Sequence, residues 1–110
     1  MADYGLRNDG TAKSSGYLGE LTNKHGDVMT EFTVGVNIDG KEVDIPTLVP
    51  TLSKGELNTL LNLDDGEPVP DNIVQAAIDH AMYRRSVGKS VFADKKDKAQ
   101  AKAVRQALGL

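Results

Sequence analysis

The stretch VMTEFTVGVNIDGKEVDI, residues 28–45, decides the fold of this chain. From Val28 to Val36 every second side chain is apolar or a threonine, which is the period of a strand with one buried face. Asp39-Gly40 then supplies a two-residue turn, the strongest short-range signal for a hairpin. The stretch therefore predicts two antiparallel strands joined by a tight turn.

The turn also sets the register of this hairpin. A two-residue loop places Ile38 opposite Lys41, and the apolar side chains of the two strands then coincide on one face. Pairing should end at Pro46, because proline has no backbone N–H to donate. The predicted apolar pairs are Val36 with Val43 and Val34 with Ile45.

An earlier strand over residues 17–22 fits the same sheet. If residues 23–26 form a four-residue loop, Leu21 opposes Val28 and Tyr17 opposes Phe32 on the face already defined. We therefore expect an α+β fold in which a three-stranded antiparallel meander has one apolar side. Two to three helices from the rest of the chain should cover that side.

Two helices follow with clear boundary signals. Ser53 and Glu56 form a capping box for a short helix that places three leucines on one face. A longer helix begins at Asp71, after Pro70, and ends near Gly88, with apolar residues at helical spacing. The expected apolar positions are Leu57, Leu60 and Leu61 in the first helix, and Ile73, Val74, Ala77, Ile78, Ala81 and Met82 in the second.

The 110 residues are the size of one domain, flanked by two different ends. Residues 1–16 show no periodicity and are interpreted as an extended N-terminal arm, either flexible or docking on a neighbour. Residues 17–93 are expected to form the single α+β domain. Residues 94–110 predict a basic helix whose apolar stripe is so thin that it is peripheral or packs on a partner.

Charge is distributed unevenly along the chain. The net charge is −3, yet residues 84–110 hold eight of the thirteen basic residues and two of the sixteen acidic ones. We favour a contact with the protein's own acidic part or an acidic partner over nucleic acid, because helix surfaces are usually solvated charge. The candidate polyanion or acidic-partner contacts are Arg84, Arg85, Lys89, Lys95, Lys96, Lys98, Lys102 and Arg105.

Tests for catalytic, cofactor and metal motifs assign no residue. The chain has no cysteine, which excludes disulfides and thiolate sites, and two histidines cannot supply a three-histidine zinc site. Gly88-Lys89-Ser90 resembles the end of a phosphate-binding loop, but Tyr83 stands where that loop has its first glycine. His80 is interpreted as a structural histidine. No apolar run approaches the ~20 residues of a membrane span.

Four segments form a further pattern: Asp9–Lys13 (DGTAK), Gly16–Leu21 (GYLGEL), Gly35–Val43 running into Ile45–Leu52 (GVNIDGKEV, IPTLVPTL) and Gly88–Ala93 (GKSVFA). Together they resemble a small module found in virion proteins, internal or structural, of tailed and mainly short-tailed bacteriophages. The resemblance covers most of residues 5–93, and IPTLVPTL is its most specific part. Val91 departs from the module, which more often has proline there.

The resemblance implies a non-enzymatic virion structural protein. The module occurs as a short chain and within very long internal or ejected virion proteins, and it implies no catalytic residue and no cofactor. We expect a head, neck or tail component in several copies among other virion proteins, present in the host cytoplasm during assembly and then in the virion.

Two alternatives stay open at this point. One is a small phage-encoded inhibitor that binds a host protein. The other is a nucleic-acid-associated protein, whose binding would fall steeply with salt. The Leu48–Leu52 crossover is interpreted first as core packing and second as a partner groove, because apolar runs are usually buried.

Overall fold

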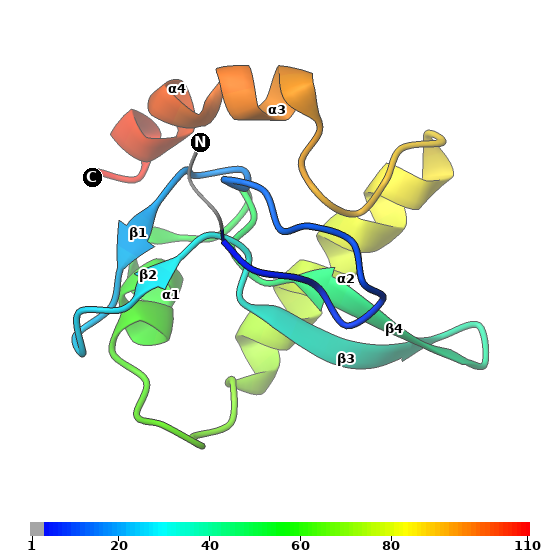
Figure 1. The fold of residues 1–110 in the computed structure, drawn as a ribbon, viewed down its shortest axis with the longest axis horizontal. Helices are drawn as coiled ribbons and strands as arrows, with labels where there is room; N and C mark the ends of the chain where they lie inside the picture. Colours follow the sequence, from blue (N-terminus) through cyan, green and yellow to red (C-terminus); the bar gives the residue numbers. More distant parts are fainter. Residues whose placement is uncertain (1–3) are drawn as a thin grey trace.

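The computed structural model describes residues 4–110 and shows an α+β fold (Figure 1). Four strands come first and four helices follow. The strands are β1 Leu21–Thr22, β2 Val28–Met29, β3 Thr33–Ile38 and β4 Lys41–Pro46. The helices are α1 Lys54–Leu61, α2 Asp71–Ser86, α3 Lys95–Ala99 and α4 Ala101–Ala107. None of the helices in this described part has the length and apolar character to cross a bilayer.

The β3–β4 hairpin forms in the predicted register. Ile38 pairs with Lys41, and the ladder ends where Thr33 meets Pro46. Asp39 and Gly40 have φ angles of 54° and 81°, the two positive values that a two-residue turn of this hand requires. The register is confirmed because the turn and the apolar alternation demand the same pairing.

The predicted three-stranded meander is wrong. β1 and β2 form a separate two-stranded sheet, and Leu21 pairs with Met29 rather than with Val28. The connecting loop has five residues rather than four, since the side chain of Asn23 accepts hydrogen bonds from the N–H groups of His25 and Asp27. One extra residue moves every side chain to the other face, so Met29 is buried and Val28 is 58% exposed.

A backbone break at Phe32 separates the two sheets. Its φ of 44° is incompatible with a strand, so the alternation that begins at Val28 does not continue into β3. The carbonyls of Glu31 and Phe32 instead accept hydrogen bonds from the N–H of Thr47, and the Glu31 carbonyl also accepts from the N–H of Leu48. These hydrogen bonds attach the segment that follows β4 to the backbone at Glu31 and Phe32.

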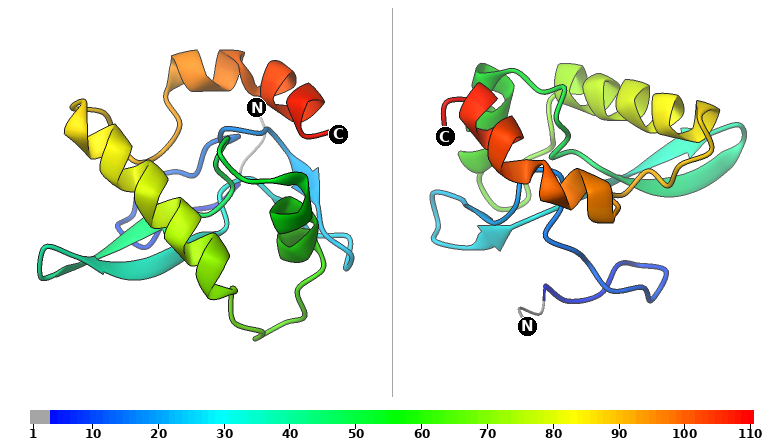
Figure 2. Two further views of the ribbon diagram at one scale, coloured as in Figure 1. Left: turned by 180° about the vertical axis from the view of Figure 1, so that it is seen from behind. Right: turned by 90° about the horizontal axis from the view of Figure 1, so that it is seen from above.

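The Leu48–Leu52 crossover is core, as its apolar sequence predicted. Leu48 and Val49 are fully buried, and Leu52 is 3% exposed. They join a cluster with α1 and the β1–β2 sheet, while a second cluster lies between α2 and the β3–β4 hairpin. Figure 2 shows α2 across one face of that hairpin and the N-terminal loop on the opposite side.

Both predicted helices form with their predicted boundaries. Ser53 and Glu56 make the capping box of α1. In α2, Ile73, Ala77 and Ala81 are buried as expected, whereas Met82 is 43% exposed. Gly88 has a φ of 74°, and Lys89 donates its N–H to the carbonyl of Arg84, which closes the helix. The fourth buried residue of α2 is Arg84 itself.

The basic C-terminal helix is two short helices separated at Gln100. Asp94 and Asp97 form a capping box at the start of α3. Leu108 is buried in the main apolar cluster, and Val104 packs against that cluster. The helices therefore pack on the chain's own core through a thin stripe.

An extended N-terminal arm is also wrong for the described residues 4–16. These residues form a closed loop, in which Leu6 bridges Ala12 and the N–H of Arg7 donates to the carbonyl of Thr11. The carboxylate of Asp9 accepts hydrogen bonds from the N–H and hydroxyl of Thr11. Figure 1 shows this loop beside the β3–β4 hairpin. The rest of the predicted arm, residues 1–3, lies outside the described residues.

Candidate functional site

A buried ion pair joins the N-terminal loop to the break between the sheets. Glu31 is 2% exposed, and its carboxylate accepts from Nε of Arg7 at 3.0 Å and from Nη2 at 2.6 Å. The N–H of Ser14 donates to the same carboxylate at 3.1 Å. The guanidinium carbon of Arg7 lies 3.9 Å from the ring centroid of Phe92. The arginine is therefore held between a carboxylate and an aromatic face.

A second buried arginine holds the segment that follows α2. Arg84 is 4% exposed, and its Nε donates to the carbonyl of Ser90 at 2.8 Å. Its Nη2 donates to the carbonyl of Phe92 at 3.2 Å and lies 2.9 Å from a carboxylate oxygen of Asp97. Asp94 is the second anion, at 3.5 Å. Arg84 thus connects α2, the GKSVFA segment and the start of α3.

Tyr17, near the other end of the chain, also binds the segment that follows α2. Its hydroxyl donates to the carbonyl of Val91 at 2.7 Å. Burial raises the pKa of Tyr17 to about 12, partly opposed by the nearby charge of Arg84. The phenol therefore stays protonated and remains a donor at neutral pH. Three successive carbonyls, at residues 90–92, are thus bound by the side chains of Arg84 and Tyr17.

His80 lies against this cluster without a hydrogen bond on one ring nitrogen. Its ring meets that of Tyr17 edge-on at a centroid distance of 5.0 Å, and its buried Nδ1 has no partner among the described residues. Burial, and secondly the charge of Arg84, lower the pKa of His80 below its ordinary value of 6.5. His80 is therefore neutral at pH 7 and acts here as a packed ring.

This shift predicts a pH-dependent stability. Because the unfolded chain takes up a proton on His80 more readily than the folded chain, the free energy of unfolding should fall as pH drops below 6.5 towards the lowered pKa, and His80 should have no effect above that range. Urea denaturation between pH 5 and 7 measures the slope. His80→Phe should flatten it, whereas Met82→Leu, at an exposed and uncharged position of the same helix, should leave it unchanged. An unaltered slope in His80→Phe would contradict this assignment.

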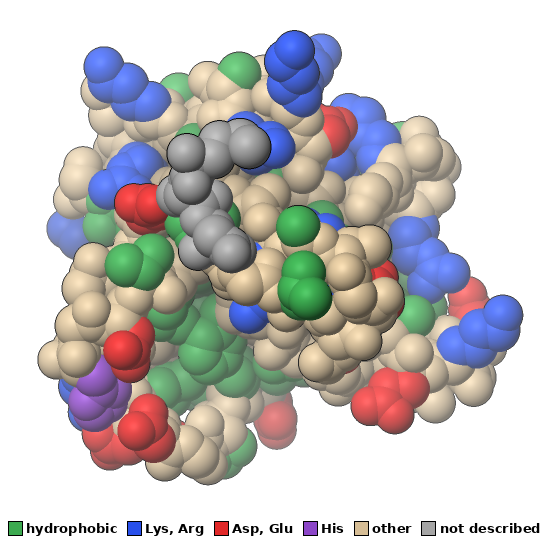
Figure 3. Space-filling view, viewed as in Figure 1, with side chains coloured by type: hydrophobic (Ala, Val, Ile, Leu, Met, Phe, Trp, Pro, Cys, Tyr) green, Lys and Arg blue, Asp and Glu red, His purple; other side chains and the backbone are tan. Residues whose placement is uncertain are grey.

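The structure divides the eight basic residues proposed from the sequence. Arg84 is buried and committed to internal contacts, so it is no surface contact residue. Arg105 is half-buried, and its Nη1 donates to the carbonyls of Leu18 and Glu20. Figure 3 shows basic side chains spread over the upper and right-hand parts of this face rather than in one patch. The exposed members are Arg85, Lys89, Lys95, Lys96, Lys98 and Lys102.

Sequence reasoning missed the residues at the centre of the molecule. Arg7 and Glu31 are 24 positions apart, and no local pattern links them. Arg84 did carry a signal, because it continues the helical spacing of Ile73, Ala77 and Ala81 along the buried face of α2. A charged residue on such a stripe predicts an internal partner.

A groove runs beside β4, at the outer side of this cluster. Its volume is about 410 Å³. Arg7 and Asp9 line it from the N-terminal loop, Glu42–Ile45 from β4, and Arg85 and the 89–92 segment from the end of α2. In the described chain, no group of three or more histidines or carboxylates is placed to hold a metal ion. The lining of the groove combines charged side chains with the apolar side chains of Val43, Ile45, Val91 and Phe92.

Comparison with protein-family models, with curated proteins and with solved structures finds no match to this chain.

Proposed function

We propose that the chain is a non-enzymatic structural component of a bacteriophage particle, a small head, neck or tail protein that assembles with other virion proteins in several copies. The proposal rests on the resemblance of four segments to a virion module. One structural observation supports it: several of these segments are bound to distant parts of the fold.

Three of the segments make such contacts. Tyr17, in GYLGEL, binds the carbonyl of Val91 in GKSVFA. The N–H groups of Thr47 and Leu48, in IPTLVPTL, bind the break before β3. Such bonds stabilise a scaffold and leave these groups with internal partners. A module that occurs both as a short chain and within long virion proteins needs a fold that is held together in this way.

The outer face of α2 offers a surface for neighbours in an assembly. Met82 is 43% exposed, Tyr83 63% and Val87 50%, and Tyr83 and Val87 lie one helical turn apart. Apolar side chains grouped on an exposed helix are typical of protein contacts. Close by, the exposed cations Arg85 and Lys89 suit an acidic neighbour.

Quantitative mass spectrometry of purified particles from the parent phage tests the proposal. We expect peptides of this protein at a fixed ratio to the portal protein, and that ratio gives the copy number. A phage enzyme expressed in the same infection but not packaged serves as the control for contamination. If the protein is abundant in infected cells and missing from the particles, the structural proposal is overturned in favour of an inhibitor of a host protein.

A further inference from the structure

The outer edge of β4 carries unpaired backbone groups. Among the described residues β4 pairs only with β3. Because the two-residue turn makes Ile38 and Lys41 a hydrogen-bonded pair, the pairs alternate along the ladder, and Glu42 and Asp44 direct their N–H and C=O groups away from β3. Within residues 4–110 no hydrogen bond is made to these four groups. They form a short template for another strand.

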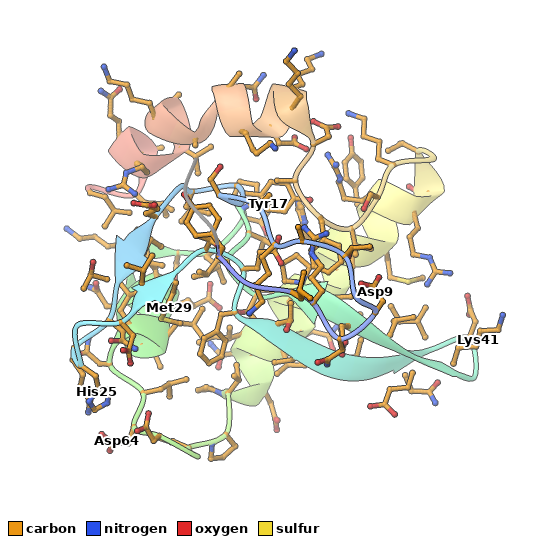
Figure 4. All side chains as sticks on the ribbon, viewed as in Figure 1. Asp9, Tyr17, His25, Met29, Lys41 and Asp64 are labelled. Carbon is orange, nitrogen blue, oxygen red and sulfur yellow. The ribbon has the colours of Figure 1, made fainter. Side chains whose placement is uncertain are left out.

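The groove beside β4 follows this same edge. Four consecutive residues, Glu42–Ile45, line it. Since neighbouring side chains of a strand point to opposite faces, a hollow that touches all four lies at the edge of the strand and not over one face. Figure 4 shows Asp9 in the N-terminal loop beside the hairpin and Lys41 at the hairpin's tip. The hollow therefore lies where an added strand would run.

Charge distinguishes the two walls of the groove. Asp9, Glu42 and Asp44 are acidic, and none of them forms an ion pair with another described residue. Asn8 donates to Asp44 at 2.8 Å, which places the N-terminal loop on the acidic side. The opposite wall, at the end of α2, carries Arg85 and Lys89. On β4 itself, Glu42 and Asp44 lie on one face and Val43 and Ile45 on the other, so an added strand whose side chains alternate between basic and apolar matches this edge.

A second copy of the chain is a poor occupant. Two β4 edges that paired antiparallel about a twofold axis would place Glu42 opposite Asp44 in both directions. Like charges directly opposite one another destabilise a sheet. The edge therefore favours a strand from a different protein. Opposite Glu42 and Asp44, that strand would carry cationic side chains, where a second copy would carry carboxylates.

We propose that the outer edge of β4 binds an extended segment of another protein, with Lys or Arg at every second position, as an added strand. The segment pairs with Glu42 and Asp44 and ends at Pro46, which has no N–H to offer. Backbone hydrogen bonds supply affinity, and the acidic wall selects the basic side chains. The inference does not rest on the virion setting, because any protein with such a segment can supply the strand.

Fluorescence anisotropy with a labelled peptide of sequence TKVKVKT tests this binding on the full chain. We expect saturable binding, and no comparable binding of TEVEVET. Glu42→Lys should weaken binding by about tenfold or more, because it removes one partner of the lysines and adds a repelling charge. The control Asp65→Lys makes the same change of charge at an exposed loop position and should alter the affinity little. Circular dichroism confirms that both variants are folded.

Two further measurements separate strand addition from simple charge attraction. N-methylation of one alternate set of the peptide's amides should abolish binding, while methylation of the other set is tolerated, since only one set faces β4. Hydrogen exchange at the amides of Glu42 and Asp44 should slow when the peptide is bound. The proposal is overturned if TKVKVKT does not bind, or if neither Glu42→Lys nor N-methylation of the peptide changes its affinity. It is also overturned if the protein forms a dimer that depends on Glu42.

Discussion

Glu31→Ala should lower the free energy of unfolding by about 3–5 kcal/mol, the range for breaking one side of a buried ion pair. The change leaves the guanidinium of Arg7 without its two short carboxylate bonds, and it leaves the N–H of Ser14 without its acceptor. The N-terminal loop would then lose its main attachment to the break between the sheets. Urea denaturation followed by far-UV circular dichroism measures the loss.

Two comparisons make this expectation specific to the pair. Glu42→Ala removes a carboxylate from an exposed position on β4, and should change stability by no more than about 0.5 kcal/mol. The double variant Arg7→Met with Glu31→Leu should recover most of the loss, because apolar side chains of similar volume remove the uncompensated charge. A loss in Glu31→Ala as small as that in Glu42→Ala would show that the buried pair contributes little.

Gly16→Ala should cost about 3 kcal/mol or more, because two effects act together. Gly16 has a φ of 75°, which residues with a Cβ rarely adopt. A Cβ at this position would also lie 2.2 Å from the carbonyl oxygen of Thr30, so the backbone would have to move. Thermal denaturation measures the change as a midpoint lowered by roughly 10 °C or more.

Gly26→Ala separates the two effects. Gly26 has a similar φ of 84°, but a Cβ there would meet nothing within 4 Å. This variant should therefore cost only about 1 kcal/mol, the conformational part alone. If both variants lose the same stability, the close approach of Gly16 to Thr30 has no energetic consequence, and the packing of the N-terminal loop is looser than the contact implies.

Gly16 and Glu31 act on the same part of the molecule. Gly16 opens the GYLGEL segment, and only glycine fits against Thr30. Tyr17, its neighbour, reaches the GKSVFA segment. Together with Glu31 they set the position of the N-terminal loop, which also forms one wall of the groove beside β4. A destabilised loop should therefore weaken any strand that binds there.

Local chemistry was sufficient for several elements. The Asp39-Gly40 turn and the alternation beside it determined the β3–β4 register, since both act within a few residues. The capping box of α1 and the glycine end of α2 likewise depend on groups one turn apart. The apolar crossover at Leu48 was predictable as core because burial follows directly from side-chain type.

The residues of the candidate site were much harder to predict from the sequence. The groove beside β4 combines the N-terminal loop, a strand and the end of α2, and nothing in one segment reveals the other two. The eight basic residues formed a single set by position along the chain, but Arg84 turned inward and Arg105 bound the carbonyls near residue 18. Net charge by segment does not distinguish a solvated cation from a buried one.

The sequence by itself determined the α+β class, the β3–β4 hairpin and the two capped helices, because these depend on interactions between near neighbours. Only the tertiary structure decided the separation into two sheets, the closed N-terminal loop and the roles of Arg7 and Arg84. The sheets separate because the backbone at Phe32 turns to offer its carbonyl to Thr47, a contact across 15 residues. The arginines are buried because carboxylates and carbonyls brought together by the fold replace their water.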